Sequence, residues 1–116
     1  MRALMLAAMQ SGSGKTAVTC ALLAAARRRG LDVHPFKTGP DYIDPMFHTR
    51  AAGRPSRNLD LFLQGEEGVR RTLATAGNAA GEGFALIEGA MGYYDGMAGG
   101  TDAGAWAVAD ALGVPA

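Results

Sequence analysis

The sequence predicts an α/β protein, built on a parallel β-sheet with helices on its faces. Along the 116 residues, three short apolar segments alternate with segments of helical character. A glycine-rich loop that contains a lysine lies between the first apolar segment and the first helix, where phosphate-binding loops of this class occur. Parallel strands also need crossover connections, which the intervening helices supply.

The first part of the chain is predicted to contain two strands and one helix. Residues 3–8 are continuously apolar, as in a strand that is covered on both faces. Residues 15–29 have an apolar side at helical spacing and end in three arginines, which favour a helix C-terminus, and Gly30 follows as a cap. Residues 32–37 predict a second strand, in which Pro35 lacks a donor for the sheet.

The second part is predicted to contain one further strand. Residues 38–60 include three prolines and little periodicity, so we expect a long functional loop. A helix over 66–76, a strand over 84–87 that ends at Glu88, a glycine-rich loop and a helix over 102–112, capped by Thr101 or Asp102, complete the order. Residues 114–116 resemble the approach to another strand. We therefore expect a domain truncated after its third strand–helix unit, with an open sheet edge.

Charge and composition argue against several classes of protein. Eleven basic and eleven acidic residues balance, so there is no net field to attract nucleic acid or an anionic membrane. No segment approaches the roughly 20 apolar residues of a membrane span. Cys20 is the only cysteine, which prevents an internal disulfide and favours the cytoplasm. With one cysteine and two histidines, we do not expect a Cys/His metal site.

The strongest functional signal is a phosphate-binding loop between a strand and a helix, made by Ser11, Gly12, Ser13, Gly14, Lys15, Thr16 and Ala17. Backbone N–H groups and the helix N-terminus bind anions in such loops. Lys15 is predicted to reach the phosphates of ATP, and the Thr16 hydroxyl to ligate Mg²⁺. Met9 replaces the first glycine of the usual pattern, and a helix start with a solvated lysine is the alternative. The sequence thus predicts a P-loop NTPase-like fold, with residues 1–116 as one ATP-binding domain.

Two further polar clusters follow predicted strands. Lys37 ends the second strand and Asp41 and Asp44 follow it, whereas Glu88 ends the third strand and Asp95 follows. Ligands of parallel sheets bind outside the carboxyl ends of the strands, so the clusters are expected beside the phosphate loop. There a lysine neutralises a migrating phosphoryl group and carboxylates hold Mg²⁺. Taken singly, each aspartate is also a typical turn or cap residue.

The remaining polar residues leave alternatives open. Arg54, Arg57 and Asn58 could bind carboxylates, but a solvated loop with surface ion pairs explains them nearly as well. His34 is expected to be structural. His48 is either a substrate contact or an ordinary loop residue.

Taken together, these segments resemble the cobyrinate a,c-diamide synthases of corrinoid biosynthesis, whose ATP-binding domain is of the CobQ/CobB/MinD/ParA type. The resemblance is carried by residues 11–16, 35–45, 48–49, 53–60 and 88–96. It implies that Mg-ATP phosphorylates the a and c side-chain carboxylates of a cobyrinic-acid-type macrocycle, and that ammonia from glutamine then displaces phosphate. Cobyrinate, hydrogenobyrinate and nickel sirohydrochlorin are all compatible with these motifs.

The resemblance also implies roles for individual residues. Lys15 and Lys37 would contact phosphates, and Thr16, Asp41 and Glu88 would surround Mg²⁺. The catalytic residues would be Lys37, Asp41, Asp44, Glu88 and Asp95, and the macrocycle would meet Tyr42, Arg54, Arg57 and Asn58. A glutaminase needs a nucleophilic cysteine with a histidine partner, and Cys20 lies within the phosphate-loop helix. We therefore expect the glutaminase domain to be absent from this chain.

Two other hypotheses compete with this one. Partitioning ATPases of the ParA and MinD kind carry a signature lysine where this chain has Gln10, so a nucleotide switch ranks lower. An inactive truncated remnant is the other alternative. The sequence leaves a homodimer open.

Overall fold

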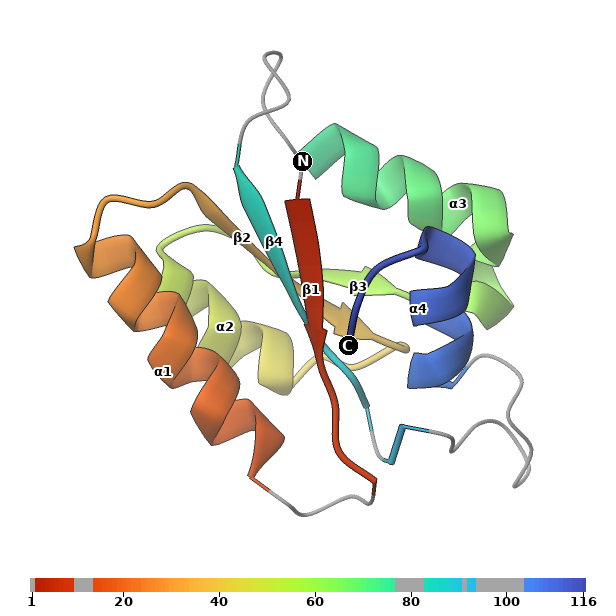
Figure 1. Cartoon of the computed structure of the whole chain (residues 1–116), viewed down its shortest axis with the longest axis horizontal. Coiled ribbons are helices and arrows are strands. Elements are labelled where there is room, and N and C mark those ends of the chain that lie inside the picture. Colours follow the sequence, from red (N-terminus) through yellow and green to blue (C-terminus); the bar gives the residue numbers. More distant parts are fainter. Residues whose placement is uncertain (1, 10–13, 77–82, 91, 94–103) are drawn as a thin grey trace.

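The fold is one parallel four-stranded sheet with helices on both faces (Figure 1). The structure is a computed structural model of the chain and describes residues 2–9, 14–76, 83–90, 92–93 and 104–116. Its elements are β1 (Arg2–Leu6), α1 (Lys15–Arg28), β2 (Val33–Thr38), α2 (Asp44–Ala52), β3 (Arg57–Leu59), α3 (Leu61–Ala76), β4 (Phe84–Glu88) and α4 (Ala105–Leu112). The strand order is β1-β4-β2-β3. The predicted α/β class is confirmed.

Two helices cover each face of the sheet. Helices α1 and α2 pack together on one face, where Leu23 and Ala52 meet Val33 and Leu86. Helices α3 and α4 cover the other face (Figure 1). Side chains along a strand point alternately to the two faces of the sheet, so the strand residues that point to this second face form a separate and larger core. Its buried members are Met5, Phe36, Leu59, Val69, Ala85, Ile87, Ala105, Val108 and Ala109.

The prediction of one long loop over residues 38–60 is wrong, because this segment contains α2 and β3. Helix α2 has a proline in its first turn and ends at Gly53, whose left-handed φ of 76° suits a glycine cap. It buries only His48 and Ala52, so it has almost no apolar stripe. Strand β3 has three residues and exists through its pairing with β2. The sheet therefore has four strands where three were predicted.

The last two helices match the predictions apart from their starts. Helix α3 begins at Leu61 but is interrupted at Gly65 (φ 72°, ψ 173°), so its regular part agrees with the predicted helix over 66–76. Helix α4 begins at Ala105 with Gly104 at the N-cap position. The predicted caps Thr101 and Asp102 lie outside the described residues.

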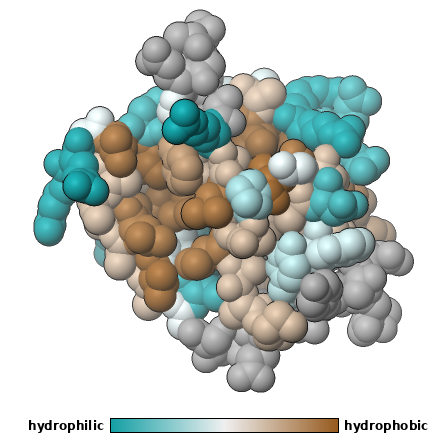
Figure 2. Space-filling view, in the orientation of Figure 1, coloured by the Kyte–Doolittle hydropathy of each residue, from teal (hydrophilic) through white to brown (hydrophobic). Residues whose placement is uncertain are grey.

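The outer edge of β1 meets the end of the chain. The Met5 N–H donates to the carbonyl oxygen of Pro115 at 2.8 Å, so the residues after α4 run alongside β1, as predicted for the approach to a further strand. Figure 2 shows hydrophobic side chains gathered over α1, where Val18 and Leu22 are exposed. Within the described part of the chain, no helix has both the length and the apolar character required to cross a membrane.

The strand register positions the functional site. In the sheet register, Lys37 of β2 is the partner of Glu88 of β4, and Glu88 is also the partner of Leu6 of β1. The carboxyl ends of these three strands therefore lie together at one edge of the sheet. Pro35 is tolerated in β2 because pairing with β3 begins one residue later, at Phe36.

Candidate functional site

Glu88, at the end of β4, is the centre of a buried polar cluster. Its side chain is fully buried. The Thr16 hydroxyl donates to Oε2 at 2.9 Å, and Lys37 Nζ donates to the same oxygen at 2.5 Å. His48 Nε2 lies 2.9 Å from the other oxygen, Oε1. One carboxylate thus joins the phosphate-loop helix α1, strand β2 and helix α2.

Lys37 lies among three carboxylates. Besides Glu88, its ammonium group pairs with Asp44 in the first turn of α2, and with Asp41 at 3.5 Å. The Lys37 residue is only 3% exposed, so water screens these pairs little. One positive charge faces three negative ones, and the excess negative charge favours a further cation.

Glu88 and Lys37 both keep their charged forms in the cluster. Burial would raise the pKa of Glu88, but hydrogen bonds from His48, Lys37 and Thr16 outweigh burial and hold it at about 2. Burial would lower the pKa of Lys37, yet the hydrogen bonds to Asp44 and Glu88 raise it above its ordinary value. Glu88 is therefore ionised and Lys37 protonated at neutral pH.

Asp41 shapes the loop between β2 and α2. Its Oδ1 accepts the backbone N–H groups of Ile43, at 2.8 Å, and Asp44, at 3.4 Å. Partial burial would raise the pKa of Asp41, but these two bonds and Lys37 lower it. The loop therefore directs a charged carboxylate toward Lys37.

The described end of the phosphate loop opens directly into α1. Gly14 takes a left-handed φ of 85°, and the helix begins at Lys15 with no acidic residue in its first turn. The first turn of α1 therefore contributes no carboxylate of its own to its N-terminal dipole, and the acidic side chain that meets it is Glu88, which accepts from Thr16. In the part of the chain that the structure describes, Lys15 has no ion-pair partner. Ser11, Gly12, Ser13 and Asp95 lie outside that part.

The donor set beside the phosphate loop fits Mg²⁺ that is also held by phosphates and water. The Thr16 hydroxyl donates its hydrogen bond to Glu88, so the lone pairs of its oxygen remain available. Thr16 Oγ1 and Glu88 Oε2 lie 2.9 Å apart. Adjacent ligands of an octahedral Mg²⁺ ion are also about 2.9 Å apart, because each Mg²⁺–oxygen bond is about 2.0–2.1 Å long. No group of three or more His, Cys, Asp or Glu among the described residues could hold a metal by itself. Mg²⁺ that is also bound by phosphates and water needs only one or two carboxylates from the protein.

His48 belongs to this cluster, which sequence reasoning missed. Its side chain is fully buried, with Glu88 on one ring nitrogen and Ser56 Oγ 3.1 Å from the other. A signal was available, because His48 lies four residues after Asp44 and such residues share a helix face. The signal could be used only once α2 was recognised as a helix.

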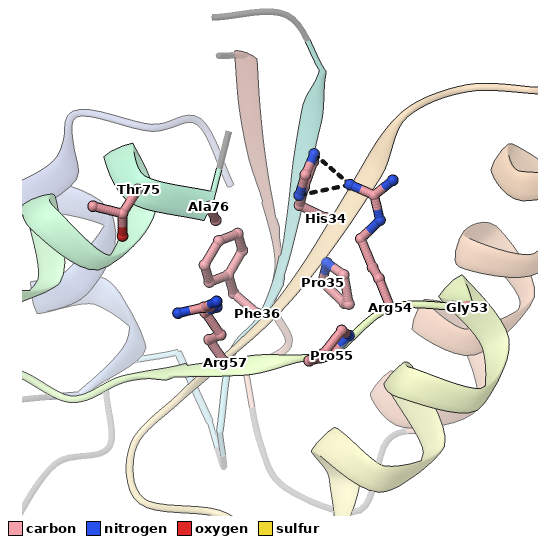
Figure 3. Close-up of a pocket in the computed structure, with 9 residues that line it drawn as sticks. All are labelled: His34, Pro35, Phe36, Gly53, Arg54, Pro55, Arg57, Thr75 and Ala76. Atoms are coloured by element: carbon pink, nitrogen blue, oxygen red, sulfur yellow. Dashed lines mark hydrogen bonds between the residues drawn. The ribbon is translucent and has the colours of Figure 1, made fainter. Parts of the chain in front are cut away.

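The predicted substrate residues separate into two places. Asn58 pairs in register with Lys37, and its buried Oδ1 has no hydrogen-bond partner in the described part of the chain. Tyr42 is 78% exposed in the loop before α2. Arg54 and Arg57 instead line a cavity of about 310 Å³ toward the amino ends of β2 and β3 (Figure 3). The structure does not bring these arginines to the Glu88 cluster.

Arg54 has local partners at that opposite end. Its guanidinium pairs with Asp32 at 2.6 Å and contacts the ring of His34 (Figure 3). The expected structural role of His34 agrees with these contacts. On α1, burial and then the charges of Glu88 and Asp44 raise the pKa of the Cys20 thiol. Cys20 is therefore unsuited to act as a nucleophile.

Comparison with known families agrees with this geometry. Residues 4–97 match the CobQ/CobB/MinD/ParA nucleotide binding domain. The chain belongs to this family. The matched residues include the phosphate-loop sequence, both strands that carry Lys37 and Glu88, and α2, so the buried cluster lies within the matched domain.

Individual relatives confirm the resemblance predicted from the motifs. The cobyrinate a,c-diamide synthase of Clostridium acetobutylicum is 53% identical over 83% of this chain, and the hydrogenobyrinate a,c-diamide synthase of Rhodobacter capsulatus is 55% identical over 84%. The hydrogenobyrinate a,c-diamide synthase of Rhizobium meliloti is 52% identical over 98%. The chain spans only 21%, 22% and 26% of the lengths of these three relatives.

Proposed function

We propose that the protein is an ATP-dependent ligase that amidates the a and c side-chain carboxylates of a cobyrinic-acid-type tetrapyrrole, a reaction of cobalamin biosynthesis. The observation that carries the proposal is the Glu88 carboxylate, which joins Thr16 of the phosphate loop to Lys37 at the carboxyl edge of the sheet. The names of the relatives supply the substrate class.

The proposed chemistry has two steps. A substrate carboxylate oxygen attacks the γ-phosphorus of ATP, and the bond to the β–γ bridging oxygen breaks to release ADP and leave an acyl phosphate. Ammonia then attacks the acyl carbon, phosphate leaves, and the nitrogen loses a proton. Phosphorylation is required because a free carboxylate has no adequate leaving group.

The chain's own residues stabilise charge in the first step. Lys15, at the start of α1, and Lys37 would neutralise the phosphoryl oxygens in the transition state. Thr16, Asp41 and Glu88 would hold Mg²⁺, which when bound neutralises further phosphate charge. Asp44 contacts Lys37 and would orient its ammonium group toward the transferred phosphoryl group. Asp95 is proposed for the same edge on the resemblance alone.

On the substrate side, Asn58 and Tyr42 are the best-supported contacts. Buried polar atoms normally have partners, and Asn58 Oδ1, beside Lys37, has none among the described residues, which suits a group that meets a ligand. Tyr42 presents an exposed aromatic ring to a large planar substrate. Arg54 and Arg57 stay candidates on sequence grounds, although their cavity lies toward the other end of the sheet.

The nitrogen donor and the partners belong to the same proposal. We propose that ammonia is supplied free or by a glutaminase that lies outside residues 1–116, and that the reaction takes place in the cytoplasm. The macrocycle stays open among cobyrinate, hydrogenobyrinate and nickel sirohydrochlorin, and so does a homodimer.

Calorimetric titration of the protein with Mg-ATP, beside a Lys15→Ala variant, tests the proposal. Saturable binding that the variant loses supports a working phosphate site, and amide formation from the tetrapyrrole with free ammonia is then measured. If the folded wild-type protein fails to bind Mg-ATP, the proposed function is wrong for this chain.

A further inference from the structure

His48 is an unusual residue to find fully buried behind a nucleotide site. It lies on α2 between two polar side chains, with Nε2 at 2.9 Å from Glu88 Oε1 and Nδ1 at 3.1 Å from Ser56 Oγ. Both ring nitrogens are therefore satisfied, and none of the side chain is exposed. Burying an imidazole beside a buried carboxylate is costly unless the network is complete. Here the network is complete.

The two oxygens of Glu88 have separate partners. Thr16 and Lys37 both donate to Oε2, whereas Oε1 meets His48 and no other of the residues that the structure describes. The terminal torsion of a glutamate is broad, so the residue by itself does not fix the directions in which its two carboxylate oxygens point. The contact with His48 holds Oε1 away from the phosphate loop and leaves Oε2 toward it.

The contact with Ser56 completes the hydrogen bonding of the His48 ring. A carboxylate oxygen accepts, so Nε2 is the nitrogen that donates to Glu88 Oε1, and Nδ1 faces the Ser56 hydroxyl. Ser56 is itself held, since its backbone N–H donates to Thr49 Oγ at 3.0 Å. The Thr49 hydroxyl donates to the carbonyl oxygen of Pro45 at 2.7 Å. Ser56, directly before β3, and Thr49 of α2 thus support the His48 ring on its Nδ1 side.

We propose that His48, held by Ser56, is a positioning residue that orients the Glu88 carboxylate so that Oε2 faces Thr16 and the metal–nucleotide. His48 does not touch substrate or nucleotide in this role and acts through Glu88. The inference rests on the proposed function, because it takes Mg²⁺ to bind at Thr16 and Glu88. Mutation of a hydrogen-bond partner of a metal-binding carboxylate commonly lowers the metal affinity about 10- to 100-fold.

The test measures the affinity of the protein for ATP by calorimetry, once with Mg²⁺ and once with EDTA. The ratio of the two dissociation constants is the gain due to Mg²⁺. His48→Leu removes the donor to Glu88 at similar volume, and we expect it to reduce this ratio by about 10- to 100-fold while the affinity in EDTA stays unchanged. His48→Gln keeps an N–H donor at the Nε2 position and should restore most of the ratio.

Two variants complete the experiment. His34→Leu is the matched control, because His34 is also a buried histidine of this sheet, 8% exposed, but contacts Asp32 and Arg54 at the opposite end. It should leave the ratio at the wild-type value. Ser56→Ala removes only the support of the ring and should lower the ratio less than His48→Leu does. If His48→Leu does not fold, the ratio measured for Ser56→Ala tests the inference in its place.

The outcomes separate the inference from the proposed function. A wild-type protein that binds ATP no better with Mg²⁺ than with EDTA contradicts the proposed function and the inference together. If Mg²⁺ raises the ATP affinity of the wild type and raises that of His48→Leu, or in its place Ser56→Ala, by the same factor, the inference alone is overturned. Equal losses with Mg²⁺ and with EDTA show a merely structural role and also overturn it.

Discussion

Lys37 and Glu88 are register partners on adjacent parallel strands, and Lys37 Nζ lies 2.5 Å from Glu88 Oε2. The two residues are 51 positions apart in the sequence, yet backbone pairing of β2 with β4 brings them together. Pairing of buried opposite charges contributes only when the geometry is good and the remaining polar atoms are satisfied. His48, Thr16 and Asp44 satisfy those atoms here. The site should therefore respond sharply to small changes in its donors.

Replacing Thr16 tests the donor set beside the phosphate loop. Thr16→Ala removes the hydroxyl that bonds Glu88 at 2.9 Å, whereas Thr16→Ser keeps it. We expect the alanine variant to lose at least about tenfold in Mg-ATP affinity and the serine variant to stay near wild type. Calorimetric titration of the three proteins measures the difference. Wild-type affinity in the alanine variant would show that the hydroxyl is not a ligand.

The charge on Glu88 should appear in the pH dependence of stability. Its pKa is about 2 in the folded protein against an ordinary 4.5, so the ionised form stabilises the fold above about pH 4.5. This contribution, on the order of 3 kcal/mol, is lost as the pH falls from about 4.5 toward 2. Urea unfolding of wild type and Glu88→Gln should show a stability difference that narrows across this window. A constant difference between pH 7 and pH 3 would be incompatible with the lowered pKa.

Two phenylalanines of contrasting burial test the core. Phe36 is fully buried next to Lys37, and Phe62 is 65% exposed. Phe36→Ala should reduce the free energy of unfolding by about 3–5 kcal/mol through lost burial and a new cavity. Phe62→Ala should change it by no more than about 0.5 kcal/mol. Chemical denaturation followed by circular dichroism measures both. Similar losses in the two variants would contradict the assigned core.

The ion pair of Asp32 with Arg54 should stabilise the fold modestly. The side chains lie 2.6 Å apart but are 36% and 37% exposed, so water screens the pair. A double-mutant cycle with Asp32→Asn and Arg54→Gln should give a coupling of about 0.2–1 kcal/mol that declines with added salt. Nucleotide affinity should not change, because the pair lies at the opposite end of the sheet. A salt-independent coupling of several kcal/mol would indicate a buried pair.

The sequence by itself predicted the elements that have strong local signals. The apolar segments of β1 and β4 and the helix after the phosphate loop have such signals, because a buried parallel strand is continuously apolar and Gly14 and Lys15 occur between a strand and a helix. It also placed Lys37 and Glu88 at one edge, since the carboxyl ends of parallel strands coincide.

Only the tertiary structure revealed α2 and β3 and what they do. Helix α2 buries one histidine and one alanine, and β3 is three residues long, so neither carries a local pattern strong enough to be recognised. Their stability comes from packing on α1 and pairing with β2. For the same reason the role of His48 and the distant position of Arg54 could not be predicted, because a buried hydrogen bond depends on how elements meet in space, which local periodicity does not encode.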